Sequence, residues 1–293
     1  MGRFALWVFV GALTLPGHAI WAGSERPEVK SASAVVLDAS TGDEIFGKDA
    51  DQIRSIASTT KIFVAMAVRE KGLDLEGWTE ITKSDAHEAR GGSRTRLEVG
   101  DRFTNRDLLR AMLIASDNRA PTALARAAGM DRDDLIAAMN KIAKRLKLKK
   151  TRFTDATGLR GNVSTAREMA LALKTALADE ELRKVMSDPN ETVVTKSGRK
   201  IEYASTNVPL RMGKYDVIGG KTGYTDAAGY CFITGARFAG KEVVMAFLKS
   251  EGKGTRFADF DRVAAWLSER IGKPGERPAR SSAEGDAKVD QSR

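Results

Sequence analysis

The chain has 293 residues, of which 42% are hydrophobic and 30% charged, the balance of a soluble globular protein. Its single cysteine excludes an internal disulfide and a thiolate metal site, and its two histidines exclude a zinc site built on several histidines. The net charge of +9 favours anionic surroundings. The basic residues look scattered and lack interleaved aromatics, so we predict a solvated basic surface and no nucleic-acid partner.

The N-terminus has the order of a secretory signal peptide. Met1–Arg3 carries a positive charge, an apolar run of 12 residues follows over Phe4–Leu15, and a proline and small residues come next. That run is shorter than the ~20 residues of a membrane-spanning helix. We therefore predict a signal peptide at residues 1–22, cleaved after Ala19 or Ala22, with a retained N-terminal anchor as the alternative. The expected location is the periplasm or cell envelope, with at most peripheral membrane contact.

The next elements are a hairpin and a buried helix. Ser33–Leu37 is a short apolar strand, and Glu44–Phe46 returns after a turn. Ile62–Val68 is apolar around its whole circumference, which predicts a buried helix. Ser58 stands at the start of that helix, and Gly72 ends it.

The middle of the chain has helical periodicity, and the second half reads as strands. Helices are expected between Asp107 and Leu148, with Pro121 and Asp131 each near a helix start, and over Thr165–Leu173 with Ser164 as its cap. The expected strands are Thr192–Thr195, Lys200–Tyr203, Val217–Tyr224, Gly229–Ala236 and Glu242–Leu248. Phe257–Ile271 is expected to be a closing amphipathic helix.

This order of elements predicts an α+β fold. One antiparallel sheet would be built from both ends of the chain with helices packed on it. An all-helical lobe of about residues 79–190 would complete a cleft, which is a common place for a site. The folded domain is expected to span residues 23–272, followed by a disordered polar tail at 273–293.

Three short motifs carry the chemistry, in the order Ser58-Thr59-Thr60-Lys61, Ser116-Asp117-Asn118 and Lys221-Thr222-Gly223. Ser58 and Lys61 are three residues apart, so they share one helix face about a turn apart. A serine hydroxyl needs a base to become nucleophilic, and a lysine serves as that base only when its pKa falls through burial or nearby positive charge. The apolar helix and Lys221 would supply both.

The remaining motif residues suit proton relay and substrate binding. Ser116 would relay a proton to the leaving amine, and Asn118 would hold the substrate's peptide. Lys221 and Thr222 would bind a terminal carboxylate, and Gly223 would leave room for substrate to lie along the strand. Backbone N–H groups at the nucleophile and on that strand would form an oxyanion hole.

Taken singly, these motifs are weak signals. Ser-x-x-Lys recurs at Ser197–Lys200 and Ser250–Lys253, and Ser-x-Asn recurs at Ser205–Asn207, whereas Lys-Thr-Gly occurs once. Alone, Ser58 would be read as a helix cap. Order, spacing and context together override that interpretation. His87, flanked by charges, is predicted at the surface, and Cys231, flanked by apolar residues, is predicted to be a buried small hydrophobe.

With these motifs the sequence resembles the low-molecular-mass penicillin-binding proteins, which are D-alanyl-D-alanine carboxypeptidases and endopeptidases. The likeness runs from about Ser33 to Ile271 and includes Arg152–Leu159 and Ser164–Met169. It implies a β-lactamase/DD-peptidase-like fold, a peptidoglycan peptide substrate, acylation by β-lactams, a part in cell-wall biogenesis and cell shape, and no metal or organic cofactor. It also implies that Arg256 helps to hold the substrate carboxylate. The Ser-Asp-Asn-Arg sequence and the short segment after the last helix look more like the endopeptidase branch.

Two alternatives remain open. A class A β-lactamase uses a carboxylate in the pattern Glu-x-x-Leu-Asn for deacylation. The chain offers Glu168-Met169-Ala170-Leu171-Ala172, which lacks the asparagine, so Glu168 is interpreted as a helix residue. The alternative of another class is a non-catalytic cell-wall-binding protein on the same fold.

Overall fold

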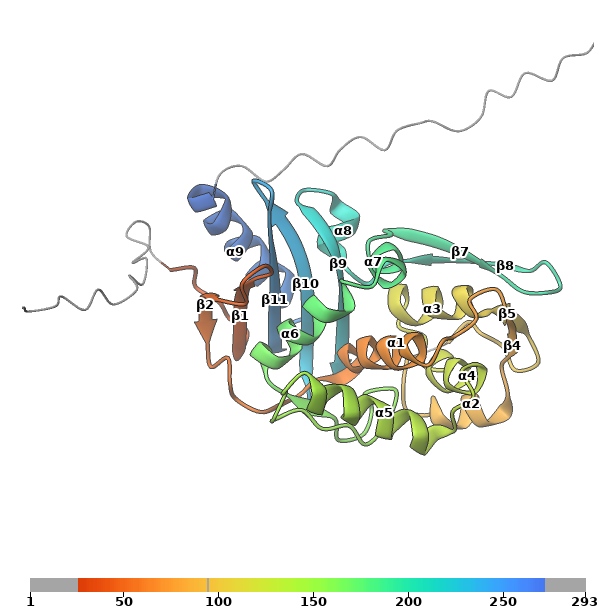
Figure 1. Cartoon of the computed structure of the whole chain (residues 1–293). Coiled ribbons are helices and arrows are strands. Elements are labelled where there is room, and N and C mark those ends of the chain that lie inside the picture. The colour runs from red at the N-terminus through yellow and green to blue at the C-terminus, as the bar shows by residue number, and fades with distance from the viewer. Residues whose placement is uncertain (1–25, 94, 272–293) are drawn as a thin grey trace, which may run out of the picture.

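The two ends of the folded chain meet in one antiparallel sheet. The computed structural model describes residues 26–93 and 95–271, so the predicted signal peptide and the predicted disordered tail lie outside the described residues. The sheet has five strands in the order β2-β1-β11-β10-β9, which confirms a sheet built from both ends of the chain (Figure 1). Its strands are β1 (Ser33–Asp38), β2 (Glu44–Lys48), β9 (Asp216–Thr225), β10 (Gly229–Phe238) and β11 (Lys241–Ser250).

Both faces of this sheet are buried, and the alternation of side chains along each strand decides which core each residue joins. In β1, Val35 and Leu37 belong to the larger core, whereas Ala34 and Val36 belong to the smaller one. Side chains point alternately to opposite faces of a strand, so a fully apolar strand can serve two cores at once.

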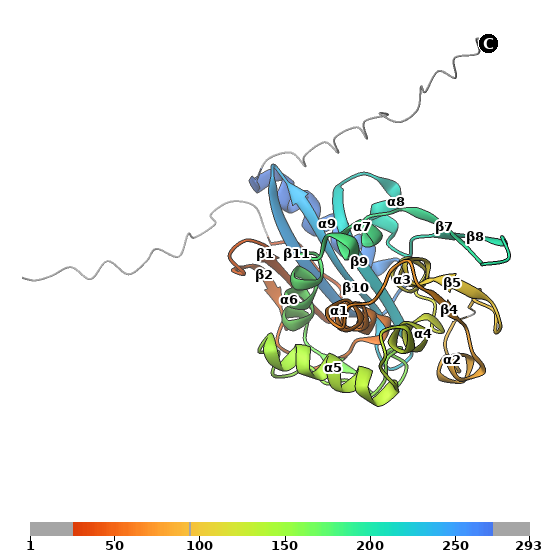
Figure 2. The same ribbon diagram turned by 45° about the vertical axis from the view of Figure 1, so that its right-hand side comes forward.

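Helices cover the two faces of the sheet. The smaller core is closed by α9 (Thr255–Ile271), and the larger one is covered by α6 (Ala166–Ala176) and α1 (Lys61–Glu70). Figures 1 and 2 show α9 on one side of the sheet and α1 and α6 on the other. The α1 helix contacts helices on several sides, as its all-round apolar sequence predicts.

The segments between α1 and α6 form the second lobe. Two of its helices start as predicted: Pro121 lies in the first turn of α4 (Ala120–Ala127), and Asp131 caps α5 (Arg132–Arg145) by accepting a hydrogen bond from the backbone of Asp134 at 2.8 Å. The other α-helices of the described chain are α2 (Lys83–Glu88), α3 (Asn105–Ile114), α7 (Glu180–Met186) and α8 (Val208–Met212).

Three details differ from the sequence predictions. The interval 79–190 also holds short strands, and the predicted strands Thr192–Thr195 and Lys200–Tyr203 form a separate two-stranded sheet packed beside α3 rather than part of the main sheet. The cap of α6 is Thr165, whose hydroxyl accepts from the backbone of Glu168 at 3.1 Å, while Ser164 bonds to Thr151 instead. The short strands are β3 (Arg54–Ser55), β4 (Trp78–Glu80), β5 (Arg102–Thr104), β6 (Val163–Ser164), β7 (Asn190–Val194) and β8 (Lys200–Ala204).

In residues 26–93 and 95–271 we find no helix that combines the length and apolar character needed to cross a bilayer.

Candidate active site

Ser58 lies in a tight turn pressed against the edge strand of the sheet. It belongs to the 3₁₀ helix η1 (Ala57–Thr60), which leads directly into α1, so it precedes the α-helix rather than starting it. A Cβ at Gly223 of β9 would stand 2.8 Å from the backbone nitrogen of Ser58. Glycine is therefore required at 223 by the close approach of β9 to the Ser58 turn, a reason that differs from the room for substrate that the sequence suggested.

Lys61 directs its amine at the Ser58 hydroxyl from within the protein. Its side chain is fully buried, and Nζ donates to Ser58 Oγ at 2.8 Å, to Asn118 Oδ1 at 2.6 Å and to the carbonyl oxygen of Thr157 at 3.0 Å. Burial lowers the pKa of Lys61 to about 7, against the opposing charges of Asp117 and Asp155. A lysine in this state exchanges its proton near neutral pH.

Lys221 is the second buried amine beside this site. It lies in β9, and its Nζ donates to the carbonyl oxygen of Thr222 at 2.9 Å. Its pKa is lowered well below the ordinary lysine value by burial first, and then by the positive charges of Lys61 and Arg256. The two lysines are thus close enough to repel each other, as the sequence analysis required.

The Ser116-Asp117-Asn118 segment forms the side of the site opposite β9 and brings Asn118 close to Lys61. Ser116 adopts a left-handed backbone conformation with φ of 64°, which aims this turn toward the same cleft. The buried carboxylate of Asp117 holds the turn by accepting from the backbone of Arg96 at 3.0 Å and of Arg119 at 2.9 Å. Burial raises the pKa of Asp117.

A third segment, Asp155–Leu159, completes the environment of the two reactive groups, and no role was predicted for it. The carbonyl oxygen of Thr157 accepts from Lys61 Nζ at 3.0 Å and from Ser58 Oγ at 3.3 Å. Asp155 shapes this turn by accepting from the backbone nitrogens of Thr157 and Gly158 at 2.9 and 3.0 Å. The Asp-x-Thr-Gly pattern is a turn signal, but it carries no information about the partner of its carbonyl.

Arg256 joins the site from α9. Its Nη1 donates to the carbonyl oxygens of Gly223 at 2.8 Å and of Cys231 at 3.1 Å, and its guanidinium lies over the Tyr230 ring at 5.1 Å. Burial lowers the pKa of Arg256 to about 10. These contacts anchor the guanidinium beside Gly223 of β9.

These elements enclose a cleft of about 590 Å³, which we call the Ser58 cleft. It brings together Ser58, Ser116, Asn118, Thr222, Gly223 and Arg256, all of which the sequence analysis singled out. Lys61 and Lys221 lie fully buried directly behind its wall. The remaining lining residues are Arg90, Gly91, Gly92, Ser93, Ala115, Leu159, Arg160, Thr206, Tyr224, Thr225 and Asp226.

Three residues with alternative roles are found outside this arrangement. The side chain of His87 is 62% exposed on α2, so it forms no Ser-His-Asp triad with Ser58. Cys231 is buried, and burial raises the pKa of its thiol to about 11, so it behaves as the predicted small hydrophobe. Glu168 lies in α6 and accepts from Lys150 and Thr151, which confirms it as a structural helix residue.

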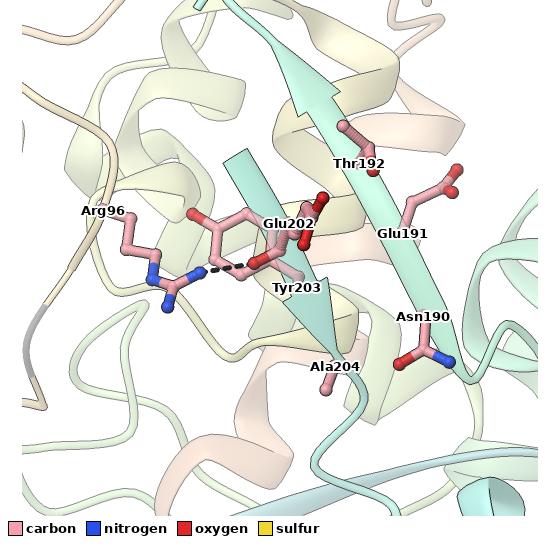
Figure 3. A pocket seen from close by; sticks show the side chains of 7 residues that line it. All are labelled: Arg96, Asn190, Glu191, Thr192, Glu202, Tyr203 and Ala204. Carbon is pink, nitrogen blue, oxygen red and sulfur yellow. Dashed lines mark hydrogen bonds between the residues drawn. The ribbon is translucent and has the colours of Figure 1, made fainter. Parts of the chain in front are cut away.

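A second hollow of about 690 Å³ lies on the β7–β8 hairpin and shares no residue with the Ser58 cleft. Figure 3 shows Arg96 reaching across it to the carbonyl oxygen of Glu202, beside the Tyr203 ring. Its lining holds neither a nucleophile near a base nor a buried amine, so the chemistry belongs to the Ser58 cleft. Across residues 26–93 and 95–271, no three His, Cys, Asp or Glu side chains gather as a metal site would require.

Comparisons with known proteins agree with this geometry. A family model described as D-alanyl-D-alanine carboxypeptidase matches residues 21–252. The chain is 33% identical over 244 residues to a D-alanyl-D-alanine endopeptidase of Pseudomonas aeruginosa, covering 83% of this chain and 78% of the relative. It is 31% identical over 249 residues to one of Escherichia coli, covering 83% and 79%. The crystal structure of a Streptomyces DD-transpeptidase superposes with a TM-score of 0.76 at 30% identity, covering 83% of this chain and 98% of that one.

Proposed function

This chain belongs to the D-alanyl-D-alanine carboxypeptidase family and is a serine peptidase, and from that premise we propose that it opens D-alanyl peptide bonds of peptidoglycan through an acyl-enzyme on Ser58. The observation that carries the proposal is the buried amine of Lys61, 2.8 Å from Ser58 Oγ and with a pKa of about 7. A base poised near the working pH is the most effective one.

The neutral form of Lys61 fits its surroundings as a general base. A neutral amine has two N–H groups and one lone pair. Asn118 Oδ1 and the Thr157 carbonyl accept the two N–H groups, at 2.6 and 3.0 Å. The lone pair is then left for the Ser58 hydroxyl, so the two acceptors orient the base as well as binding it.

The chemical steps follow from this orientation. Ser58 Oγ attacks the carbonyl carbon of the scissile bond while its proton passes to Lys61 Nζ. The tetrahedral intermediate collapses as the C–N bond breaks, and the proton is delivered through Ser116 to the leaving amine. Water then attacks the ester carbon, gives its proton to the same relay, and frees Ser58. Backbone N–H groups of Ser58 and of β9 beyond Lys221 stabilise the oxyanion.

Substrate binding is assigned to the edge of β9. This strand ends the sheet on one side, so an extended peptide can pair with it in the manner of an added strand. Asn118 holds the peptide from the opposite wall. Thr222 and Arg256 present a hydroxyl and a cation to a carboxylate in the cleft, and the buried amine of Lys221 supports them from behind the wall. Gly223 keeps the strand close to the Ser58 turn.

Within the family, we propose that cross-linked peptides are the main substrate, which makes the protein a DD-endopeptidase. Two relatives similar over more than three-quarters of their length, at 33% and 31% identity, are endopeptidases. A D-alanyl-D-alanine carboxypeptidase of Bacillus subtilis is 32% identical, but the match covers 54% of it. The resemblance of the Ser-Asp-Asn-Arg segment points the same way.

Two further properties follow from this assignment. β-Lactams should acylate Ser58, because they present a reactive amide to the same nucleophile. Export by a signal peptide at 1–22 would bring the protein to its peptidoglycan substrate in the periplasm or cell envelope. Mass spectrometry of the secreted protein tests the export, since an intact Met1 would contradict it.

The central experiment combines a fluorescent penicillin with peptidoglycan digestion. The wild-type protein should form a long-lived fluorescent adduct, and Ser58→Ala should abolish both the adduct and cleavage. Ser197→Ala, in the recurring Ser-x-x-Lys of the β7–β8 turn, is the matched control and should retain both. Rapid turnover of penicillin would instead indicate a β-lactamase. The masses of the products separate the two peptidase activities, because split dimers indicate an endopeptidase and free D-alanine a carboxypeptidase.

A further inference from the structure

A groove lies on the outside of the helical lobe, between the C-terminal half of α5 and the segment that follows it. Its volume is about 900 Å³, and none of its lining residues belongs to the Ser58 cleft. Figures 1 and 2 place α5 at the outer edge of the molecule, with α1 between it and the sheet. We call it the basic groove, and its lining is Asn140, Ala143, Lys144, Lys147, Leu148, Lys149, Thr151, Arg152, Phe153 and Thr154.

The rim of the basic groove is strongly cationic. The sequence from Lys141 to Arg152 contains seven basic residues and no acidic one, which corrects the expectation that basic residues are scattered. Two of the seven are engaged elsewhere, because Arg145 pairs with Glu70 and Lys150 donates to the Asp51 carbonyl. Four exposed cations line the groove without any carboxylate in its lining, and they are Lys144, Lys147, Lys149 and Arg152.

The floor of the basic groove is apolar. Leu148, Phe153 and Ala143 form it, and the hydrocarbon stems of the rim lysines extend its walls. A concave apolar floor accepts a protruding side chain, whereas a flat lipid surface would touch only the rim. The shape therefore favours a peptide carrying a large apolar residue over a membrane.

The groove is held open by hydrogen bonds rather than by its occupant. The side chain of Asn140 bridges α5 and the following segment, donating to the Phe153 carbonyl at 2.9 Å and accepting from the Phe153 backbone at 3.1 Å. Both walls are thus tied together at the floor. A preformed groove binds its ligand without the cost of ordering a loop.

The floor also touches the helix that carries Lys61. The rings of Phe153 and Phe63 lie 4.5 Å apart between centroids, and Phe63 is two residues beyond Lys61 in α1. The same segment continues from Phe153 to Thr157, whose carbonyl oxygen binds Lys61. A ligand on the floor would therefore contact the segment that leads to Thr157 and would lie close to the α1 helix, both of which position the amine of Lys61.

We propose that the basic groove docks an acidic peptide segment of another protein. Its carboxylates pair with Lys144, Lys147, Lys149 and Arg152, and a large apolar side chain enters between them onto Leu148 and Phe153. Charge complementarity supplies the attraction and the register, and the apolar floor supplies the specificity. Docking does not depend on the proposed catalytic function.

Fluorescence anisotropy tests the docking directly. The probe is a fluorescein-labelled peptide in which glutamates flank one central phenylalanine. Binding should weaken with added salt, and replacing the peptide's phenylalanine by serine should weaken it several-fold. The triple variant Lys144→Glu, Lys147→Glu, Lys149→Glu should lose at least about tenfold in affinity.

The matched control carries the same change in charge outside the groove, as Lys83→Glu, Lys184→Glu, Lys241→Glu. It should bind the probe within about twofold of the wild type, while circular dichroism verifies that both triple variants are folded. Equal losses in the two triple variants, or no binding at all, would overturn the proposal. So would groove-dependent binding to phosphatidylglycerol vesicles without binding to the peptide, since that result indicates a membrane surface.

The rate of acylation by a fluorescent penicillin tests whether peptide binding in the basic groove alters the reactivity of Ser58 through Lys61. This arm rests on the proposed function, and the anisotropy arm does not, so the two can fail separately. Saturating probe should change the acylation rate of the wild type and leave that of the groove triple variant unchanged. An unchanged wild-type rate would rule out regulation of acylation by the groove and would leave the groove with a docking role alone.

Discussion

The cations of the Ser58 cleft and those of the protein surface differ in burial and in their carboxylate partners. Lys61, Lys221 and Arg256 are almost completely buried, and among the described residues none of them forms an ion pair with a carboxylate. At the surface, Arg167 and Arg183 are partly exposed and are held by carboxylates at 2.6 Å. Burial without a paired carboxylate lowers the pKa of the cleft cations, whereas pairing with carboxylates raises the pKa of Arg167.

The difference shows how one residue type serves two purposes. A surface arginine keeps its charge at every accessible pH and contributes a small amount of stability. A buried lysine without a carboxylate is held near the point where it loses its proton, which costs stability but provides a base. The buried environment of Lys61 therefore marks the site of chemistry, and the surface ion pairs belong to the scaffold.

The strongest way to break this comparison is to remove the amine of Lys61 while keeping its volume. Lys61→Met should lower the rate of acylation by a fluorescent penicillin by about 10³-fold or more, because Ser58 loses its base. Thermal unfolding should show a folded protein, because the loss of hydrogen bonds to Asn118 and Thr157 is offset by removal of a buried ionisable group. Near-normal acylation of this variant would mean that another group is the base.

A smaller effect is expected from Gly223→Ala, which removes no reactive group. The new Cβ would meet the Ser58 backbone nitrogen at 2.8 Å, so the Ser58 turn must move and acylation should fall by about 10²-fold. Gly254→Ala is the control, because a Cβ there meets no atom within 4 Å. Equal rates in both variants would show that the contact between β9 and the turn is unimportant.

The pH dependence of acylation sharpens the comparison further. The pKa of Lys61 is lowered to about 7, so the neutral base forms as the pH rises through that value. Its neutral fraction grows from about a tenth at pH 6 to about nine-tenths at pH 8, and the acylation rate should rise about tenfold and then level off. Stopped-flow measurements over this range decide it. A rate that stays flat would mean that Lys61 keeps its proton.

The smallest effect should come from breaking a surface pair. Glu242 accepts from Arg183 at 2.6 Å and from Arg237 at 2.7 Å, with all three side chains partly exposed. Glu242→Gln should cost about 0.5–1 kcal/mol, or about 2–4 °C in Tm, and leave acylation unchanged. Differential scanning calorimetry with a parallel acylation assay makes the measurement. A large loss of acylation would show that surface pairs and cleft are coupled.

Much of the architecture and most of the site was readable from local sequence. The order of elements, the buried Ile62–Val68 helix and the starts of α4 and α5 follow from periodicity and capping, which involve residues close in the chain. The pairing of Ser58 with Lys61 follows from helical spacing. The separate β7–β8 sheet was missed because a hairpin pattern does not say which sheet its strands join.

By itself, the sequence determined which reactive groups exist, their order, and the spacing that puts a hydroxyl beside an amine. Only the tertiary structure decided that Thr157 and Asn118 orient that amine, that Gly223 supports the Ser58 turn, and that four basic residues line a groove. The reason is physical: the pKa of Lys61, the contact of Gly223 with the Ser58 turn and the shape of the basic groove each depend on how segments pack together and exclude water. The segments that pack in this way are far apart in the chain, so no local sequence pattern predicts their contacts.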